Sequence, residues 1–210
     1  PQDAELGVDS EVSEPGVPVH GWMLLDADQA AIKESIEAAA AYGVNHIQLS
    51  HDLIADIDQV IGDEPETLQR VETLNFAIEL AHQHGMKAYV WAHEFTGFNV
   101  EVCFAPDDPF WESRAKAYRD AFERLPDLDG VILMFGSSSP PPWLAICMCD
   151  WCLENYDDVP LFIPPPEERL RMVVERIGGA IVAEGKELYV RTFVHEPAES
   201  GWHSDGLEAA

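Results

Sequence analysis

The chain has 210 residues, of which 47% are hydrophobic, and it carries 39 acidic against 12 basic residues for a formal net charge of −27. The hydrophobic content is typical of a packed globular domain and excludes an intrinsically disordered chain. The negative charge repels phosphate backbones and anionic lipids, so we expect neither nucleic acid nor a membrane as a partner.

The first fifty residues predict an arm, a strand, a helix and a second strand. Residues 1–16 have no hydrophobic period and read as an acidic lead-in arm. A strand over 17–25 then ends at Asp26, and the Asp26-Ala27-Asp28 turn is a good start for a helix. Gly43 is expected to end that helix, since glycine favours the residue after a helix end, and a strand over 44–50 follows.

The same alternation continues through the rest of the chain. Pro65 and Asp108-Pro109 open two further helices, and a proline-rich insertion precedes a fourth. Residues 201–210 form a low-complexity tail. The remaining strands are expected over 87–92, 130–135 and 187–194.

Strands that alternate with helices of a dozen or more residues require a parallel sheet, so the fold class is α/β. Five strands and four helices are visible, whereas an eight-stranded barrel usually takes about 250 residues. We therefore expect residues 17–200 to form a partial TIM-type (β/α)8 barrel within a larger chain, with an open five-stranded sheet as the alternative. No glycine-rich phosphate loop follows the first strand, which argues against a dinucleotide-binding domain.

Polar pairs follow strand after strand, and three of these strand ends carry a histidine beside a carboxylate. In α/β architectures the groups that do chemistry lie just past the carboxyl ends of parallel strands. In a strand, neighbouring side chains point to opposite faces, so at most one member of a pair inside a strand faces the barrel axis. The candidate site residues from this pattern are Asp26, His51, Asp52, His93, Glu94, His195 and Glu196.

Several segments resemble the family-67 glycoside hydrolases, the α-glucuronidases. The resemblance rests on Ala41 to Ser50, on Ala81 to Trp91, on Asp107 to Trp111 with Arg124 to Leu133, and on Arg191-Thr-Phe-Val194. It implies a carbohydrate-active barrel acting on polysaccharide-derived, glucuronide-containing glycosides, with Arg191 among the substrate-binding residues.

The chain departs from this family after the fourth strand. Where the family carries the glutamate that acts as general acid, this chain has Ser137-Ser138-Ser139-Pro140. Glycoside hydrolysis uses one carboxyl group to protonate the leaving oxygen and another as base or nucleophile. Glu94 and Glu196 are the available carboxylates at strand ends and are our predicted catalytic pair, with Asp26 and Asp52 behind them.

Two loop features add to the prediction. Trp143 is flanked by prolines, and its indole could act as a stacking platform for a sugar ring. Trp91 lies within a strand and is expected in the core. Cys147, Cys149 and Cys152, with Cys103 as a fourth thiol, could bind a structural zinc; a disulfide is the alternative if the protein is secreted or periplasmic.

The sequence leaves three functions open. The first is a glycoside hydrolase that requires no cofactor, and the second is a non-catalytic barrel that binds sugar or supports a neighbouring module. The third is a metal-dependent hydrolase in which His51, His93 and His195 converge on an ion.

Overall fold

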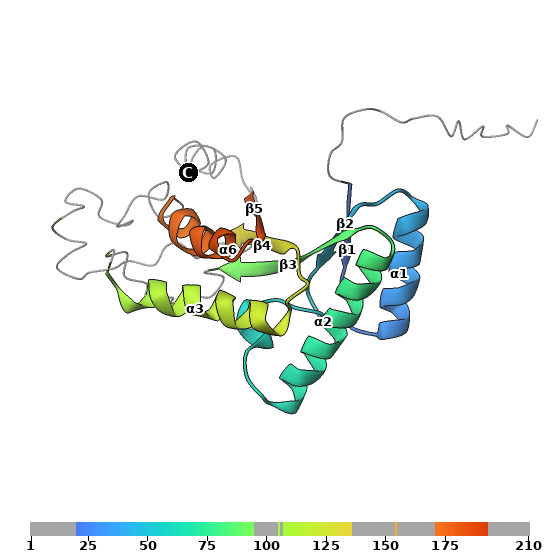
Figure 1. Ribbon diagram of the computed structural model, residues 1–210, viewed down its shortest axis with the longest axis horizontal. Coiled ribbons are helices and arrows are strands. Elements are labelled where there is room, and N and C mark those ends of the chain that lie inside the picture. Colours follow the sequence, from blue (N-terminus) through green and yellow to red (C-terminus); the bar gives the residue numbers. More distant parts are fainter. Residues whose placement is uncertain (1–19, 95–104, 106, 136–153, 155–170, 193–210) are drawn as a thin grey trace, which may run out of the picture.

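The computed structural model describes residues 20–94, 105, 107–135, 154 and 171–192, which contain a five-stranded parallel sheet (Figure 1). The strands follow one another in sequence order, so the predicted order is confirmed and no crossover of a doubly wound sheet occurs within these residues. The predicted arm and tail lie outside the described residues. The strands are β1 Gly21–Leu24, β2 His46–Leu49, β3 Lys87–Glu94, β4 Gly130–Phe135 and β5 Glu187–Thr192.

The helices begin and end where the sequence predicts. Asp28 accepts hydrogen bonds from the first amides of α1, Asp108 does so for α3, and Pro65 is the first residue of α2. Gly43 and Gly85, which follow α1 and α2, have φ of 69° and 75°, a conformation that glycine adopts without strain. The helical segments are α1 Gln29–Ala41, α2 Pro65–Gln83, α3 Pro109–Arg124, and the π-helical η3 Val174–Gly178 continued by α6 Gly179–Ala183.

The loop after β2 contains a turn that the sequence analysis missed. Within the acidic stretch 52–64, Ile57–Val60 forms the 3-10 helix η1. Asp56 caps its first turn, and the Gln59 side chain accepts a hydrogen bond from the Asp56 amide in return, a capping box. Buried Ile57 and Val60 anchor the turn to the core.

The helices cover one face of the sheet. The main core lies between that face and α1, α2, α3 and α6, and it takes alternate residues of each strand, such as Val90 and Val131. α1 contacts β1 and packs beside α2, α2 contacts β3, and α6 contacts β5 and packs beside α3 (Figure 1). No helix among the described residues is both long and apolar enough to span a bilayer.

The other strand residues point away from the helices, and we call this side the inner face because it corresponds to the interior of a barrel. It has a small apolar cluster of Tyr89, Trp91 and Ile132 with Met23 beside it. Polar side chains surround that cluster. They are His46, Gln48, His93, Glu187, Tyr189 and Arg191.

Candidate functional site

Trp91 lies at the centre of a polar cluster near the carboxyl ends of the strands. It is on β3, and the alternation of the strand points it to the inner face, where it is 5% exposed. Its indole Nε1 donates a hydrogen bond to Oε1 of Gln48 on β2, at 3.0 Å. This bond fixes the orientation of the indole ring, and other side chains pack against the ring.

Arg191, on β5, packs against the indole ring of Trp91. Its Cζ lies 4.6 Å from the centre of the Trp91 ring, a cation–π contact. None of the described residues forms a hydrogen bond or an ion pair with its guanidinium. A half-buried arginine without an acidic partner in the described part of the chain is unexpected in a protein that has 39 acidic residues.

Two histidines flank Trp91 on the same side of the sheet. The ring centres of His51 and His93 lie 6.1 and 5.8 Å from that of Trp91. His51 adopts a left-handed backbone with φ of 56°, and its Nδ1 is 2.9 Å from the Ser50 hydroxyl. Burial, and then the nearby His51, lower the pKa of His93, while Asp56 opposes them. A neutral His93 can both donate and accept a hydrogen bond near pH 7.

Glu94 follows His93 in sequence but faces the helices. Its carboxylate is 3% exposed and accepts hydrogen bonds from Arg114 of α3, with Nε 3.0 and 2.9 Å from the two oxygens and Nη2 2.8 Å from Oε1. The Tyr118 hydroxyl donates to the same carboxylate at 2.5 Å. The prediction that His93 and Glu94 point to opposite faces is therefore correct, and His93 is the member on the inner face.

Arg114 joins Glu94 to two further acids. Its Nη1 lies 2.9 and 2.8 Å from the carboxylate oxygens of Asp58, and its Nη2 lies 3.2 Å from Asp56. Burial alone would lower the pKa of Arg114, but the bonds to Glu94 outweigh it and the pKa rises. Burial and the Glu94 charge raise the pKa of Tyr118. This network holds η1, β3 and α3 together, so the position of Glu94 favours a structural role over the catalytic one we predicted.

Asp26 and Asp52 lie in turns after β1 and β2. The Asp26 carboxylate accepts a hydrogen bond from the Asp28 amide at 2.8 Å and so shapes the turn before α1. Asp52 is exposed, and its backbone carbonyl accepts a bond from Arg70. Their contacts give both residues a part in loop structure.

Three solved structures share this arrangement of strands and helices. One is a mutant of the Thermobaculum terrenum O-GlcNAc hydrolase, with a TM-score of 0.55, 10% identity, and coverage of 91% of this chain and 38% of that one. Another is a β-N-acetylhexosaminidase, with a TM-score of 0.55, 12% identity, and coverage of 84% of this chain and 47% of that one. The third is a GH138 enzyme targeting pectin rhamnogalacturonan II, with a TM-score of 0.50, 14% identity, and coverage of 93% of this chain and 23% of that one. The described residues have the parallel α/β fold that these three structures share.

The likeness is one of fold. The chain spans less than half the length of each of these proteins, which matches the partial barrel predicted from the sequence. No family model and no curated protein matches the chain. The neighbours support a glycoside hydrolase-like fold without favouring family 67, so the α-glucuronidase resemblance stays a prediction.

Other predicted site residues of the barrel lie outside the described residues. They are Trp143, His195, Glu196, and the four cysteines Cys103, Cys147, Cys149 and Cys152. Their roles stay predictions. Among the residues that the structure does describe, no group of three histidine, cysteine or carboxylate side chains is placed to hold a metal ion.

The structure thus brings His51, His93 and Arg191 together and adds Gln48 and Trp91, which the sequence analysis did not assign to the site. Trp91 was expected to be buried, and it is, but on the inner face. The signal for Gln48 was present: it alternates within β2 with buried Ile47 and Leu49, so it had to face away from the helices. Together these groups offer one cation and several neutral hydrogen-bonding atoms, a set suited to binding a hydroxylated anion.

Proposed function

We propose that this chain forms part of a carbohydrate-active barrel that binds a glycoside containing an anionic sugar, a uronic acid. The observation that supports it most is Arg191, whose guanidinium lies beside Trp91 on the inner face and is unpaired among the described residues. A guanidinium binds a carboxylate through two parallel hydrogen bonds, and stacking on an aromatic ring keeps its planar edge free for that contact.

The surroundings of Arg191 fit the rest of a sugar. His93 lies in the same row of the sheet, two strands away, and His51 follows the neighbouring strand. Imidazole nitrogens can bond sugar hydroxyls as donors or acceptors. The site lies near the carboxyl ends of the strands, where barrel enzymes bind their substrates.

Hydrolysis is the reaction that we propose for this site, by carboxylate acid and base catalysis. Glu196 is the candidate catalytic carboxylate that we retain, because Glu94 is held by Arg114 and Tyr118 on the helix side. A second carboxyl group is needed. The engagement of Glu94 also favours our second candidate function, a barrel that binds the sugar without cleaving it.

A matched pair of ligands tests the binding. We expect methyl β-glucuronide to bind this chain at least about 10-fold more tightly than methyl β-glucoside, which carries a hydroxymethyl group in place of the carboxylate, because a charge-assisted hydrogen bond contributes about 1.5–3 kcal/mol. The indole NH signal of Trp91 in an NMR titration reports binding at this site. Equal affinity for the two ligands would overturn the proposal, since the chain's negative charge gives no other reason to prefer an anion.

Turnover separates the two candidates. Incubation with aryl β- and α-glucuronides, followed by release of the aryl group, detects hydrolysis. Binding with turnover that Glu196→Gln lowers by about 100-fold or more would support the hydrolase. Binding without turnover would support the sugar-binding module.

A further inference from the structure

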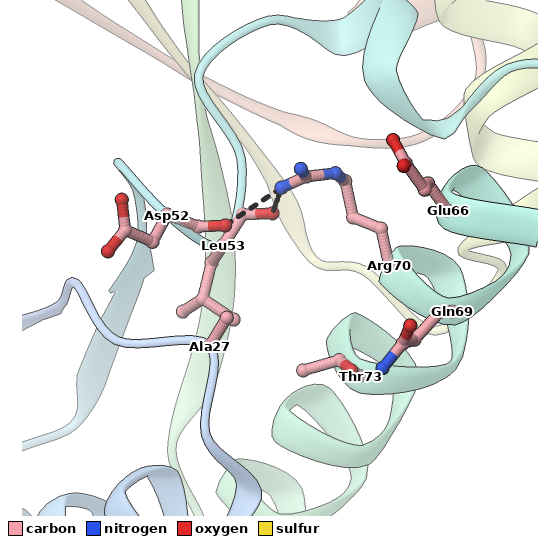
Figure 2. A pocket seen from close by; sticks show the side chains of 7 residues that line it. All are labelled: Ala27, Asp52, Leu53, Glu66, Gln69, Arg70 and Thr73. Carbon is pink, nitrogen blue, oxygen red and sulfur yellow. Dashed lines mark hydrogen bonds between the residues drawn. The ribbon is translucent and has the colours of Figure 1, made fainter.

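A cavity lies at the loop end of the sheet, apart from the cluster of residues around Trp91. It has a volume of about 260 Å³ and lies between the turns after β1 and β2 and the first half of α2. It shares no residue with the Trp91 cluster, so binding at the two places can be tested separately. Figure 2 shows the side chains that line it, namely Ala27, Asp52, Leu53, Glu66, Gln69, Arg70 and Thr73.

Arg70 forms one side of this cavity and is already held in place. Its Nη1 donates to the backbone carbonyls of Asp52 and Leu53, at 2.8 and 2.5 Å, and Figure 2 shows the side chain extending from α2 toward that turn. Because these bonds use one nitrogen, the orientation of the guanidinium is fixed while its other N–H groups remain available. The Asp52 carboxylate points away from Arg70 in Figure 2, so Asp52 contributes backbone only.

Thr73 contributes a hydroxyl to the wall of this cavity. It is 8% exposed, it lines the cavity, and in Figure 2 it points from α2 toward Leu53 and Ala27. None of the described residues forms a hydrogen bond with its hydroxyl. Most of the Thr73 side chain is buried, but its hydroxyl is open to the cavity, where it can bond water or a ligand. A ligand hydroxyl would supply the partner that the described residues do not give Thr73.

The other groups define the chemistry of that ligand. Glu66 supplies an acceptor with one negative charge, Arg70 supplies donors with one positive charge, and Gln69 supplies both a donor and an acceptor. The cavity therefore has no net preference for charge, unlike the surroundings of Arg191. Ala27 and Leu53 add an apolar side, and the volume lies below the roughly 300–1,000 Å³ of drug-sized sites, so a single ring fits.

We propose that this cavity is a second binding site for one neutral sugar unit. A pyranose carries hydroxyls around its rim and C–H groups on its faces, which match the polar groups of α2 and the apolar side formed by Ala27 and Leu53. Since Arg70 also holds the turn that follows His51, the second site lies next to the first and could receive another unit of the same glycan.

An NMR titration with methyl β-glucoside tests this inference. We expect the side-chain amide signals of Gln69 to shift and to saturate at millimolar ligand. Thr73→Val and Gln69→Ala should each weaken glucoside binding by about 3- to 10-fold, the effect of one hydrogen bond. Glu72→Ala, an exposed change on the same helix, is the matched control and should leave it unchanged.

The outcomes distinguish this site from the one at Trp91. Glucoside binding that is weaker in Thr73→Val, with the glucuronide-induced Trp91 shift retained, would confirm that the two sites are separate. Glucoside binding that neither Thr73→Val nor Gln69→Ala weakens would overturn the second site and leave the proposed function standing. Glucoside-induced shifts at Gln69, with no response of the Trp91 signal to glucuronide, would support the second site and overturn the proposed function. Because Gln69 is exposed, Gln69→Ala keeps the test valid if Thr73→Val lowers stability, with glucoside binding then followed through the backbone amide signal of position 69.

Discussion

Two arginines near strand ends show how differently the two faces of the sheet are used. Arg114, on the helix side, binds Glu94, Asp56 and Asp58 and is 12% exposed. Arg191, on the inner face, contacts the Trp91 ring and has no acidic partner among the described residues. A buried charge is stable only when it is paired, so Arg114 is part of what holds the fold together. Arg191 is left able to bind an acid from outside the chain.

The contrast extends along the inner face itself. At the amino ends of the strands, Lys87 pairs with Glu187, and Tyr89 donates a hydrogen bond to the same carboxylate. At the carboxyl ends, the described residues offer Arg191 no such acid. Barrels commonly place stability at the first end and activity at the second, and the distribution of partners here follows that division.

The largest expected effect comes from breaking the Arg114 network. Arg114→Met removes the cation from a carboxylate that is 3% exposed, so we expect the free energy of unfolding to fall by about 3–5 kcal/mol. Chemical denaturation followed by Trp fluorescence measures it. Arg119→Met is the matched control, because its exposed pair with Glu112 contributes about 0–1 kcal/mol. Equal losses in the two variants would contradict the structural role of Arg114.

Arg191→Met tests the other half of the comparison. We expect stability to change by less than about 1 kcal/mol, since no ion pair with a described residue is lost, while the affinity for methyl β-glucuronide falls by about 10- to 100-fold. Isothermal titration calorimetry measures the affinity. Arg191→Lys keeps the charge and loses the planar fork, so it should bind with intermediate affinity. An Arg191→Met variant that is strongly destabilised would show that Arg191 is a structural arginine after all.

Tyr118→Phe probes the network more gently. It deletes the hydroxyl that donates to Glu94, and because a hydrogen bond to a buried charge is involved, we expect a loss of about 1.5–3 kcal/mol. Tyr89→Phe deletes the equivalent bond to Glu187, whose side chain is largely open to water, and should cost less. Thermal unfolding of the two variants side by side gives the comparison. A larger loss of stability in Tyr89→Phe would mean that the contacts of Glu187 with Lys87 and Tyr89, rather than the Arg114 network, make the main polar contribution to stability.

Much of the fold could be predicted because its signals are local. Asp28, Pro65 and Asp108 mark helix starts, and glycines mark helix ends, each through the conformation of a few neighbouring residues. Strand alternation also predicted that His93 and Glu94 would face opposite ways. These are short-range properties of the backbone, and the sequence displays them directly.

The site could be predicted only in part because its decisive contacts are not local. Arg114 lies 20 residues from Glu94 and 56 from Asp58, so nothing in the sequence indicates that Glu94 is held on the helix side. Arg191 is of interest because no acid among the described residues pairs with it. The sequence does not indicate this, since it depends on where the acids lie in space. Asp26 and Glu94 have the right residue type at the right strand ends, and in the structure both carboxylates accept hydrogen bonds from other residues of the chain.

The smallest expected effect concerns His46. It lies on the inner face at the amino end of β2, whereas His93 lies near the carboxyl end of β3. His46 is 4% exposed, its ring stacks on Tyr89 with ring centres 4.2 Å apart, and its Nε2 has no hydrogen-bond partner among the described residues. Burial lowers its pKa from 6.5, and the nearby Glu187 opposes this. The folded chain therefore takes up a proton less readily than the unfolded chain, so the contribution of His46 to stability is present above pH 6.5 and is lost as the pH falls from 6.5 toward the lowered pKa.

His46→Phe isolates this contribution, because it keeps the aromatic contact and removes both the titration and the unbonded nitrogen. The free energy of unfolding should then change less between about pH 7.5 and 5.5 than in the parent chain, by about 1 kcal/mol or less. His20→Asn, at an exposed position, serves as the control, and denaturant unfolding at the two pH values gives the comparison. An unchanged pH dependence in His46→Phe would show that the acid sensitivity arises in the cluster around Trp91, where burial also lowers the pKa of His93.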